Sequence, residues 1–135
     1  MSQIIRKVIS TAKAPSAIGP YSQAILVDKT LYISGQVGLD PTTMKLVGDD
    51  IQSQTRQALT NMENVLAAAN CTFTNVVKVS VLLSDIKDFT AMNEVYSTFF
   101  KQPYPARAAY QVAHLPLSAK VEIEAIAVVG NLQDN

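Results

Sequence analysis

The chain has 135 residues, the size of a single domain, and no linker-like segment divides it. Its 11 basic and 11 acidic side chains give a formal net charge of zero, and charged residues make up only 16% of the sequence. A neutral chain lacks the basic surface that attracts nucleic acids and anionic lipids, and no apolar run is long enough to span a membrane. Nucleic acid is therefore an unfavoured partner, no membrane association is expected, and the low charge content indicates that other subunits cover some apolar surface.

The first half of the chain predicts three strands followed by a long helix. Residues 3–10 are typical of an opening strand, and residues 11–20 form a loop because they are rich in Pro, Gly and Ala. The β-forming runs 21–27 and 31–37 flank a short polar turn, which predicts a hairpin. Apolar residues then recur at helical spacing over residues 49–70, with Asp49 or Asp50 as the cap.

The second half predicts one strand, a second helix and two more strands. Residues 75–84 are typical of a strand, and the second helix begins at Asp88 and is ended by Pro103 and Pro105. The last two strands cover residues 107–113 and 120–129. This order predicts an α+β fold in which two helices pack on one face of a mixed sheet. The second helix carries its apolar residues on one face: Phe89, Met92, Val95, Tyr96 and Phe99.

The last strand indicates that the second face of the sheet is also covered. Its side chains alternate between the two faces, and Ile126 and Val128 share a face with Glu122 and Glu124. Two helices can cover only one face of the sheet. We therefore expect a closed ring of identical subunits, because symmetric closed assemblies are the most common.

Several kinds of chemistry lack the residues that they need. The chain has one histidine, His114, and one cysteine, Cys71, which cannot form a typical zinc site, so we expect no metal. No G-x-S-x-G motif accompanies His114, and the five glycines form no phosphate-binding loop. One cysteine cannot form an internal disulfide, which favours a cytoplasmic protein and leaves a mitochondrial or nuclear pool open.

Arg107 is the one charged residue between positions 102 and 119, counting His114 as neutral. Arg107, Glu122 and Glu124 all lie on predicted strands in apolar surroundings, where a charge is costly unless it is paired. From spacing alone, the more common arrangement is a structural Arg–Glu pair that fixes the register of a sheet or of subunits. The alternative is a pocket in which Arg107 grips a small carboxylate and a glutamate activates water, with no cofactor.

Two further segments could present polar groups to such a pocket. Tyr21 follows the rigid bend Ile18-Gly19-Pro20, and it could equally be a core aromatic at the start of a strand. Ser34 and Gly35 interrupt an apolar strand, and a glycine at such a position often permits close approach of a ligand.

Four segments in the same order resemble the signatures of the Rid family, the reactive intermediate imine deaminases, also described as liver perchloric-acid-soluble proteins. The resemblance covers nearly the whole chain, and the N-terminal RKVISTAKAP is most similar to the animal branch. It implies one imine deaminase domain over residues 1–135, with a chorismate-mutase-like fold that assembles as a homotrimer with three sites at subunit interfaces. The segments are 17–24 (AIGPYSQA), 32–41 (YISGQVGLDP), 104–116 (YPARAAYQVAHLP) and 121–128 (VEIEAIAV).

The resemblance also implies a reaction, the hydrolysis of 2-iminobutanoate and 2-iminopropanoate to 2-oxo acids and ammonia. Arg107 would bind the substrate carboxylate, and Glu122 would position and activate the water. Burial would raise the pKa of Glu122 and Arg107 would lower it, and the sequence leaves open which effect prevails. Glu124 should share the strand face of Glu122 and receives no role. The other residues that would bind substrate are Tyr21, Ser34, Gly35, Asn93 and the backbone of Ala109, where many bacterial relatives carry cysteine.

Two other functions remain open at this stage. One is a single-strand-specific endoribonuclease that inhibits translation, which the neutral charge does not favour. The other is a trimeric binding or holdase protein without catalysis, in which Arg107 and Glu122 form a buried ion pair.

Overall fold

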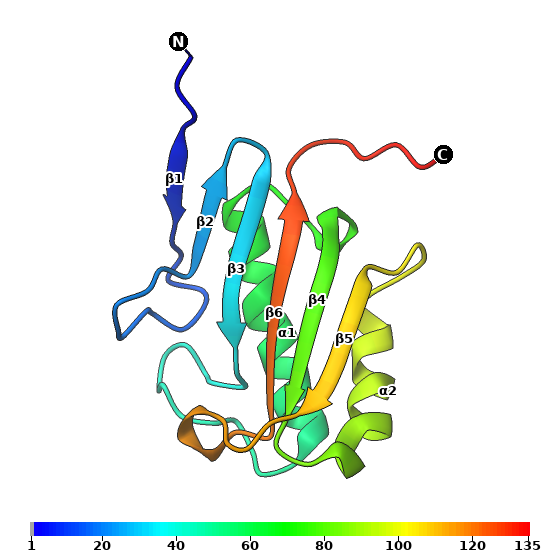
Figure 1. The fold of residues 1–135 in the computed structure, drawn as a ribbon. Coiled ribbons are helices and arrows are strands. Elements are labelled where there is room, and N and C mark those ends of the chain that lie inside the picture. The colour runs from blue at the N-terminus through cyan, green and yellow to red at the C-terminus, as the bar shows by residue number, and fades with distance from the viewer. Residues whose placement is uncertain (1) are drawn as a thin grey trace.

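Six strands form one mixed sheet in the computed structural model, which describes residues 2–135 (Figure 1). Their order across the sheet is β1-β2-β3-β6-β4-β5, so the C-terminal strand lies near the centre. Neighbouring strands are antiparallel except β4 and β5, which are parallel because a helix connects them. The strands are β1 (Arg6–Ile9), β2 (Ala24–Val27), β3 (Thr30–Gln36), β4 (Val76–Leu83), β5 (Ala106–Gln111) and β6 (Val121–Val128).

The two helices, α1 (Ile51–Ala68) and α2 (Phe89–Phe99), both pack behind the sheet as Figure 1 shows it. The start of α1 agrees with the prediction, because the Asp50 side chain accepts a 2.8 Å hydrogen bond from the Ser53 backbone N–H. The predicted α+β fold with two helices on one sheet face is confirmed. Among residues 2–135, no helix is long and apolar enough to cross a membrane. The core between helices and sheet includes Leu59, Met62, Leu66, Val79, Val81 and Ile123, all fully buried.

The front of the sheet, which we call the open face, carries apolar side chains that this chain leaves uncovered. On β6, alternate residues from Val121 are buried under the helices, and the residues between them point to the open face, as predicted. Tyr32 is paired with Ile126 of that face and is 50% exposed, and Tyr110 lies one strand beyond Leu82 and is 51% exposed. Exposed aromatic rings on a sheet face favour contact with another subunit.

The structure shortens two of the predicted N-terminal strands. β1 begins at Arg6 and not at residue 3, and β2 begins at Ala24 and not at Tyr21. The reason for the second difference is Gln23, whose buried side-chain amide makes four hydrogen bonds to backbone groups of residues 11–15. These bonds hold the chain before β2 against the preceding loop, away from the strand ladder.

The second helix ends earlier than predicted. Phe100 leaves the helix in an extended conformation, although Pro103 is three residues further on. Its ring is almost fully buried and stacks on Tyr96 with 4.3 Å between ring centroids. Burial of this aromatic ring therefore ends α2 before the proline does.

Candidate active site

Arg107 lies on the edge strand β5 and points toward α2, on the helix-covered side of the sheet. Its strand partner is the fully buried Val79 of β4, and paired residues point to the same face. The guanidinium Nη1 donates a 2.7 Å hydrogen bond to Oδ1 of Asn93. Its carbon atom Cζ lies 4.7 Å from the ring centroid of Tyr96 and 5.6 Å from that of Phe89. The charge is thus held by one amide oxygen and two aromatic rings.

The helical repeat of α2 brings these three partners of Arg107 together. Phe89, Asn93 and Tyr96 follow one another at spacings of four and three residues, so they lie on one face of the helix. The sequence analysis placed Phe89 and Tyr96 on the apolar face of this helix and did not connect them with Arg107. A signal was present, because the polar Asn93 interrupts an otherwise apolar helix face between two aromatic residues.

The guanidinium opens into a hollow of about 310 Å³, which we call the arginine hollow. The backbone beside it is also available, because β5 is the edge of the sheet. The N–H of Val112 donates to Leu83 of β4, so by alternation the backbone groups of Ala109 and Arg107 point to the free edge. A guanidinium and an outward N–H on one strand edge suit a small carboxylate. The hollow is lined by Asn93, Tyr96, Ser97, Tyr104, Pro105 and Arg107.

Glu122 lies on the open face, at the start of β6, and it is partly buried there. Ser34 and Gly35 of β3 form a bulge opposite this part of β6, because the pairing slips between Ile33 and Gln36. A Cβ atom at Gly35 would lie 2.7 Å from Cδ of Glu122. Close contact with the glutamate side chain therefore requires glycine at this position.

Tyr21 and Ser34 lie near the same bulge. Tyr21 is 52% exposed and shares a small hollow of about 50 Å³ with Gly35. The Ser34 hydroxyl donates a 2.6 Å hydrogen bond to the backbone carbonyl of Ser22, next to Tyr21 in the chain. The structure thus brings together four of the predicted site residues, which we call the glutamate group: Tyr21, Ser34, Gly35 and Glu122.

The glutamate group and the arginine hollow lie on opposite faces of the sheet. Glu122 is paired with Leu82, which follows the helix-facing Val81 along β4 and therefore points to the open face. Arg107 is paired with Val79, which faces the helices. A buried ion pair between Arg107 and Glu122 of the same chain is therefore wrong, and only a pair between subunits remains open. Each chain carries both groups, and a site that uses them together needs two chains.

Burial raises the pKa of the Glu122 carboxyl, and the negative charge of Glu124 raises it further. Glu124 is paired with Ser80 and lies two residues from Glu122, so it shares the open face, as predicted. Within one chain, Arg107 does not oppose this effect, because the sheet separates the two residues. A carboxyl with a raised pKa is suited to accept a proton from water near neutral pH.

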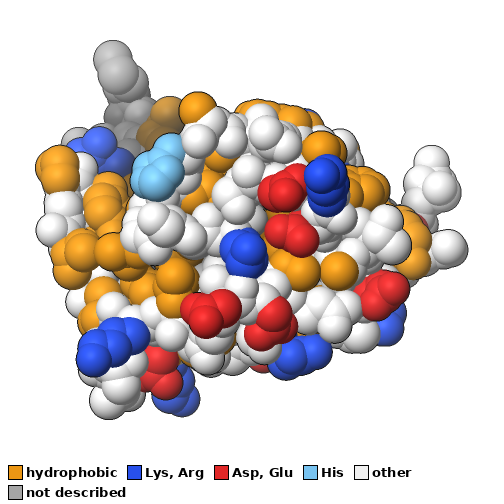
Figure 2. All heavy atoms as spheres, turned by 90° about the horizontal axis from the view of Figure 1, so that it is seen from below, with side chains coloured by type: hydrophobic (Ala, Val, Ile, Leu, Met, Phe, Trp, Pro, Cys, Tyr) orange, Lys and Arg blue, Asp and Glu red, His pale blue; other side chains and the backbone are white. Residues whose placement is uncertain are grey.

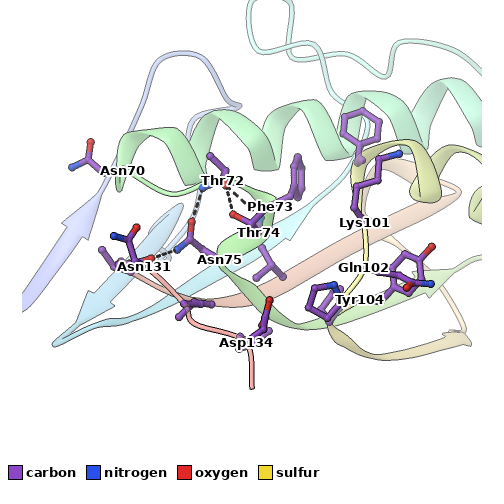
Figure 3. A pocket seen from close by; sticks show the side chains of 18 residues that line it. Asn70, Thr72, Phe73, Thr74, Asn75, Lys101, Gln102, Tyr104, Asn131 and Asp134 are labelled. Carbon is purple, nitrogen blue, oxygen red and sulfur yellow. Dashed lines mark hydrogen bonds between the residues drawn. The ribbon is translucent and has the colours of Figure 1, made fainter.

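A hollow of about 1000 Å³, larger than the arginine hollow, lies elsewhere (Figure 3). It is bounded by residues 70–77, 99–105 and the C-terminal segment 129–134, and it contains none of the predicted site residues. The Asn75 amide nitrogen donates to the backbone carbonyls of Val128 and Gly130 at 2.9 and 2.8 Å. Both N–H groups of this buried amide are used to hold the C-terminal segment, so the Asn75 amide nitrogen is not free to take part in catalysis.

The single cysteine and the single histidine of the chain lie outside both groups. Cys71 is buried, and burial raises the pKa of its thiol, which makes it a poor nucleophile. His114 is exposed in the connection between β5 and β6. Both positions agree with the sequence analysis, which gave neither residue a catalytic role.

Replacing Gly35 by alanine is expected to lower kcat/KM for a substrate of this site by about ten- to a hundredfold. The new methyl group would displace the Glu122 carboxyl, while the backbone accepts alanine because Gly35 is not in the left-handed region. Steady-state kinetics together with a melting curve measure this effect. A variant with native kcat/KM and a native melting temperature would show that the contact does not position Glu122.

Comparison with known proteins places these residues in a family. Residues 11–129 match the family described as endoribonuclease L-PSP. The human 2-iminobutanoate/2-iminopropanoate deaminase is 60% identical over 132 residues, which cover 98% of this chain and 96% of the human protein. The crystal structure of RidA from the Antarctic bacterium Psychrobacter is 46% identical with a TM-score of 0.88, covering 91% of this chain and 99% of that one. Escherichia coli TdcF with bound serine is 40% identical with a TM-score of 0.87, covering 92% and 99%. This chain therefore belongs to the Rid family and is of the animal type.

Proposed function

We propose that this protein is a 2-iminobutanoate/2-iminopropanoate deaminase that hydrolyses 2-imino acids to 2-oxo acids and ammonia. The observation that carries the proposal is the setting of Arg107, which is anchored by Asn93 at 2.7 Å and faces a hollow large enough for a small acid. The human relative of that name matches nearly the whole chain at 60% identity. The serine bound by the TdcF relative is also a small acid with a carboxylate.

The complete site in this proposal is formed by two subunits of a closed homotrimer. The arginine hollow of one subunit would meet the glutamate group of the next, which repeats three times around the ring. Two features support this arrangement. The open face carries exposed aromatic rings, including Tyr32 and Tyr110, and the edge of β5 beside Arg107 has unpaired backbone groups.

The reaction begins with the substrate carboxylate on the guanidinium fork of Arg107 and the backbone N–H of Ala109. The imine carbon then faces the glutamate group, where Glu122 accepts a proton from water as the water oxygen bonds to that carbon. Glu122 then gives this proton to the nitrogen of the resulting carbinolamine. As the C–N bond breaks and ammonia leaves, the carbinolamine hydroxyl loses its proton to Glu122 and the C=O bond of the 2-oxo acid forms. The carbon of an imine that is protonated on nitrogen is already electrophilic. The step therefore needs orientation and proton transfer and no redox group.

The activity is tested in a coupled assay in which an amino-acid oxidase generates 2-iminobutanoate and semicarbazide traps it. Wild-type protein is expected to suppress the semicarbazone, and Arg107→Ala is expected to lose this effect. If wild type leaves the semicarbazone unchanged with several imines, the deaminase proposal fails and the holdase hypothesis gains support.

The ribonuclease hypothesis requires RNA cleavage that Arg107→Ala retains and that falls steeply with salt. On the face in Figure 2, acidic and basic side chains are interspersed, which does not favour RNA binding.

The acid limb of the pH profile is expected to move to lower pH when Glu124 is replaced by glutamine. The negative charge of Glu124 raises the pKa of Glu122, so its removal lets Glu122 lose its proton at lower pH. The measurement is kcat/KM against pH for wild type and Glu124→Gln, with the exposed Glu63→Gln of α1 as the matched control. An acid limb that stays in place, or that moves to higher pH, would contradict Glu122 as the base.

A further inference from the structure

The hydroxyl of Tyr96 is buried beside Arg107, close enough for Arg107 to act on its pKa, yet it makes no hydrogen bond of good geometry. Tyr96 is only 6% exposed, and among residues 2–135 its hydroxyl is the one buried side-chain oxygen or nitrogen that is left unpaired. An unpaired buried hydroxyl costs free energy in the folded state, so its presence calls for a reason. The proposed catalytic steps give this hydroxyl no role.

The ring that carries this hydroxyl is fixed in place. It stacks on Phe100 with 4.3 Å between centroids and 19° between the ring planes, and Phe100 in turn contacts Phe73 edge-on at 4.8 Å. Tyr96 therefore cannot turn its hydroxyl away from the arginine hollow, which it lines together with Arg107. The cluster holds the ring at 4.7 Å from the guanidinium carbon.

The chemistry of the neighbour determines what the hydroxyl can do. A guanidinium has five N–H donors and no acceptor, so a tyrosine beside it can serve only through its oxygen. One nitrogen of Arg107 is already committed to Asn93. Burial raises the pKa of the Tyr96 hydroxyl, and Arg107 only partly opposes this, so the group stays neutral, and its oxygen has lone pairs that can accept a hydrogen bond.

We propose that Tyr96 is a positioning residue for substrate binding: its hydroxyl accepts a hydrogen bond from Arg107 when a carboxylate occupies the arginine hollow. With Asn93 on one nitrogen and Tyr96 as a second anchor, the guanidinium fork is held in the orientation that both carboxylate oxygens require. The inference rests on the carboxylate role proposed for Arg107.

The test is Tyr96→Phe, which keeps the ring and removes the oxygen. We expect the dissociation constant for 2-oxobutanoate, measured by chemical-shift titration, and the Michaelis constant for 2-iminobutanoate to rise about tenfold. The value of kcat should stay within about twofold, because an anchor used equally in ground and transition states changes KM alone. The melting temperature should stay the same or rise, since an unpaired buried hydroxyl is removed.

A double-mutant cycle separates this role from a general effect on the fold. In an Arg107→Lys background, Tyr96→Phe should weaken binding by less than about twofold, because the fork that it orients is gone. An equal loss in both backgrounds, a native Kd in the single variant, or a clear fall in melting temperature would overturn the inference for Tyr96. If Arg107→Lys itself binds 2-oxobutanoate normally, the proposed carboxylate role fails as well, so the two failures are distinguishable.

Discussion

Replacing Arg107 by lysine is expected to weaken 2-oxobutanoate binding by about a hundredfold while the assembly stays intact. Lysine keeps the positive charge but loses the two parallel N–H donors, the 2.7 Å hydrogen bond to Asn93 and the flat contact with the Tyr96 ring. The measurements are a binding titration, sedimentation of the assembly and a melting curve. The value of kcat/KM should fall by a similar factor, because the carboxylate is held through the whole reaction.

The control for this variant is Arg56→Lys, an exposed position on α1 where a single charge is sufficient. Its binding and turnover should match those of wild type. If Arg107→Lys binds 2-oxobutanoate as tightly as wild type does, a charge alone suffices there and the bidentate grip is wrong. If its melting temperature drops steeply and binding is unchanged, Arg107 is a structural residue.

Two inactive variants are expected to restore each other in mixed assemblies. In the proposed homotrimer, Arg107→Ala lacks the side chain that binds the carboxylate and Glu122→Gln lacks the base, so each variant alone should lose about a hundredfold or more in kcat/KM. In a trimer that combines them at random from an equimolar mixture, a site is whole when one subunit supplies Arg107 and its neighbour supplies Glu122. Every ring of three that contains both variants has such a junction at one of its three sites, so about a third of native activity should return in the isolated mixed trimers.

The measurement is turnover by mixed trimers that are refolded together and isolated through two different tags. A mixture of Arg107→Ala with Arg107→Lys is the matched control, because both changes damage the same half of the site and no recovery is expected. Recovery in the first mixture supports a site shared between subunits. Failure to recover, in trimers shown to contain both variants, would mean that Arg107 and Glu122 do not act in one site.

Local patterns in the sequence are sufficient to predict the helices and strands of this fold. The helical spacing of residues 49–70 and the strand run at 75–84 depend only on neighbours along the chain, and both elements form within a few residues of the predicted limits. Two of the boundaries that differ depend on contacts with other segments. β2 starts late because Gln23 bonds to residues 11–15, and α2 ends early because Phe100 buries its ring against Phe73 as well as Tyr96.

The candidate site shows the same division. Arg107 stands out in the sequence because it is the one charge in an apolar stretch. The two-residue period of β6 correctly placed Glu122 and Glu124 on one face. The contact between Gly35 and Glu122 depends on a bulge between β3 and β6, strands that are far apart in the chain. The periodicity of the sequence does not predict such a bulge.

By itself, the sequence determined the order of elements, the shared face of the two glutamates and the isolation of the Arg107 charge, because these follow from spacing along one chain. The tertiary structure decided which face of the sheet Arg107 takes. The side chains of β5 differ little in burial, so its pattern does not reveal which side the helices cover. That choice comes from the pairing of Arg107 with Val79 and from the packing of α2, which puts Arg107 and Glu122 on opposite faces.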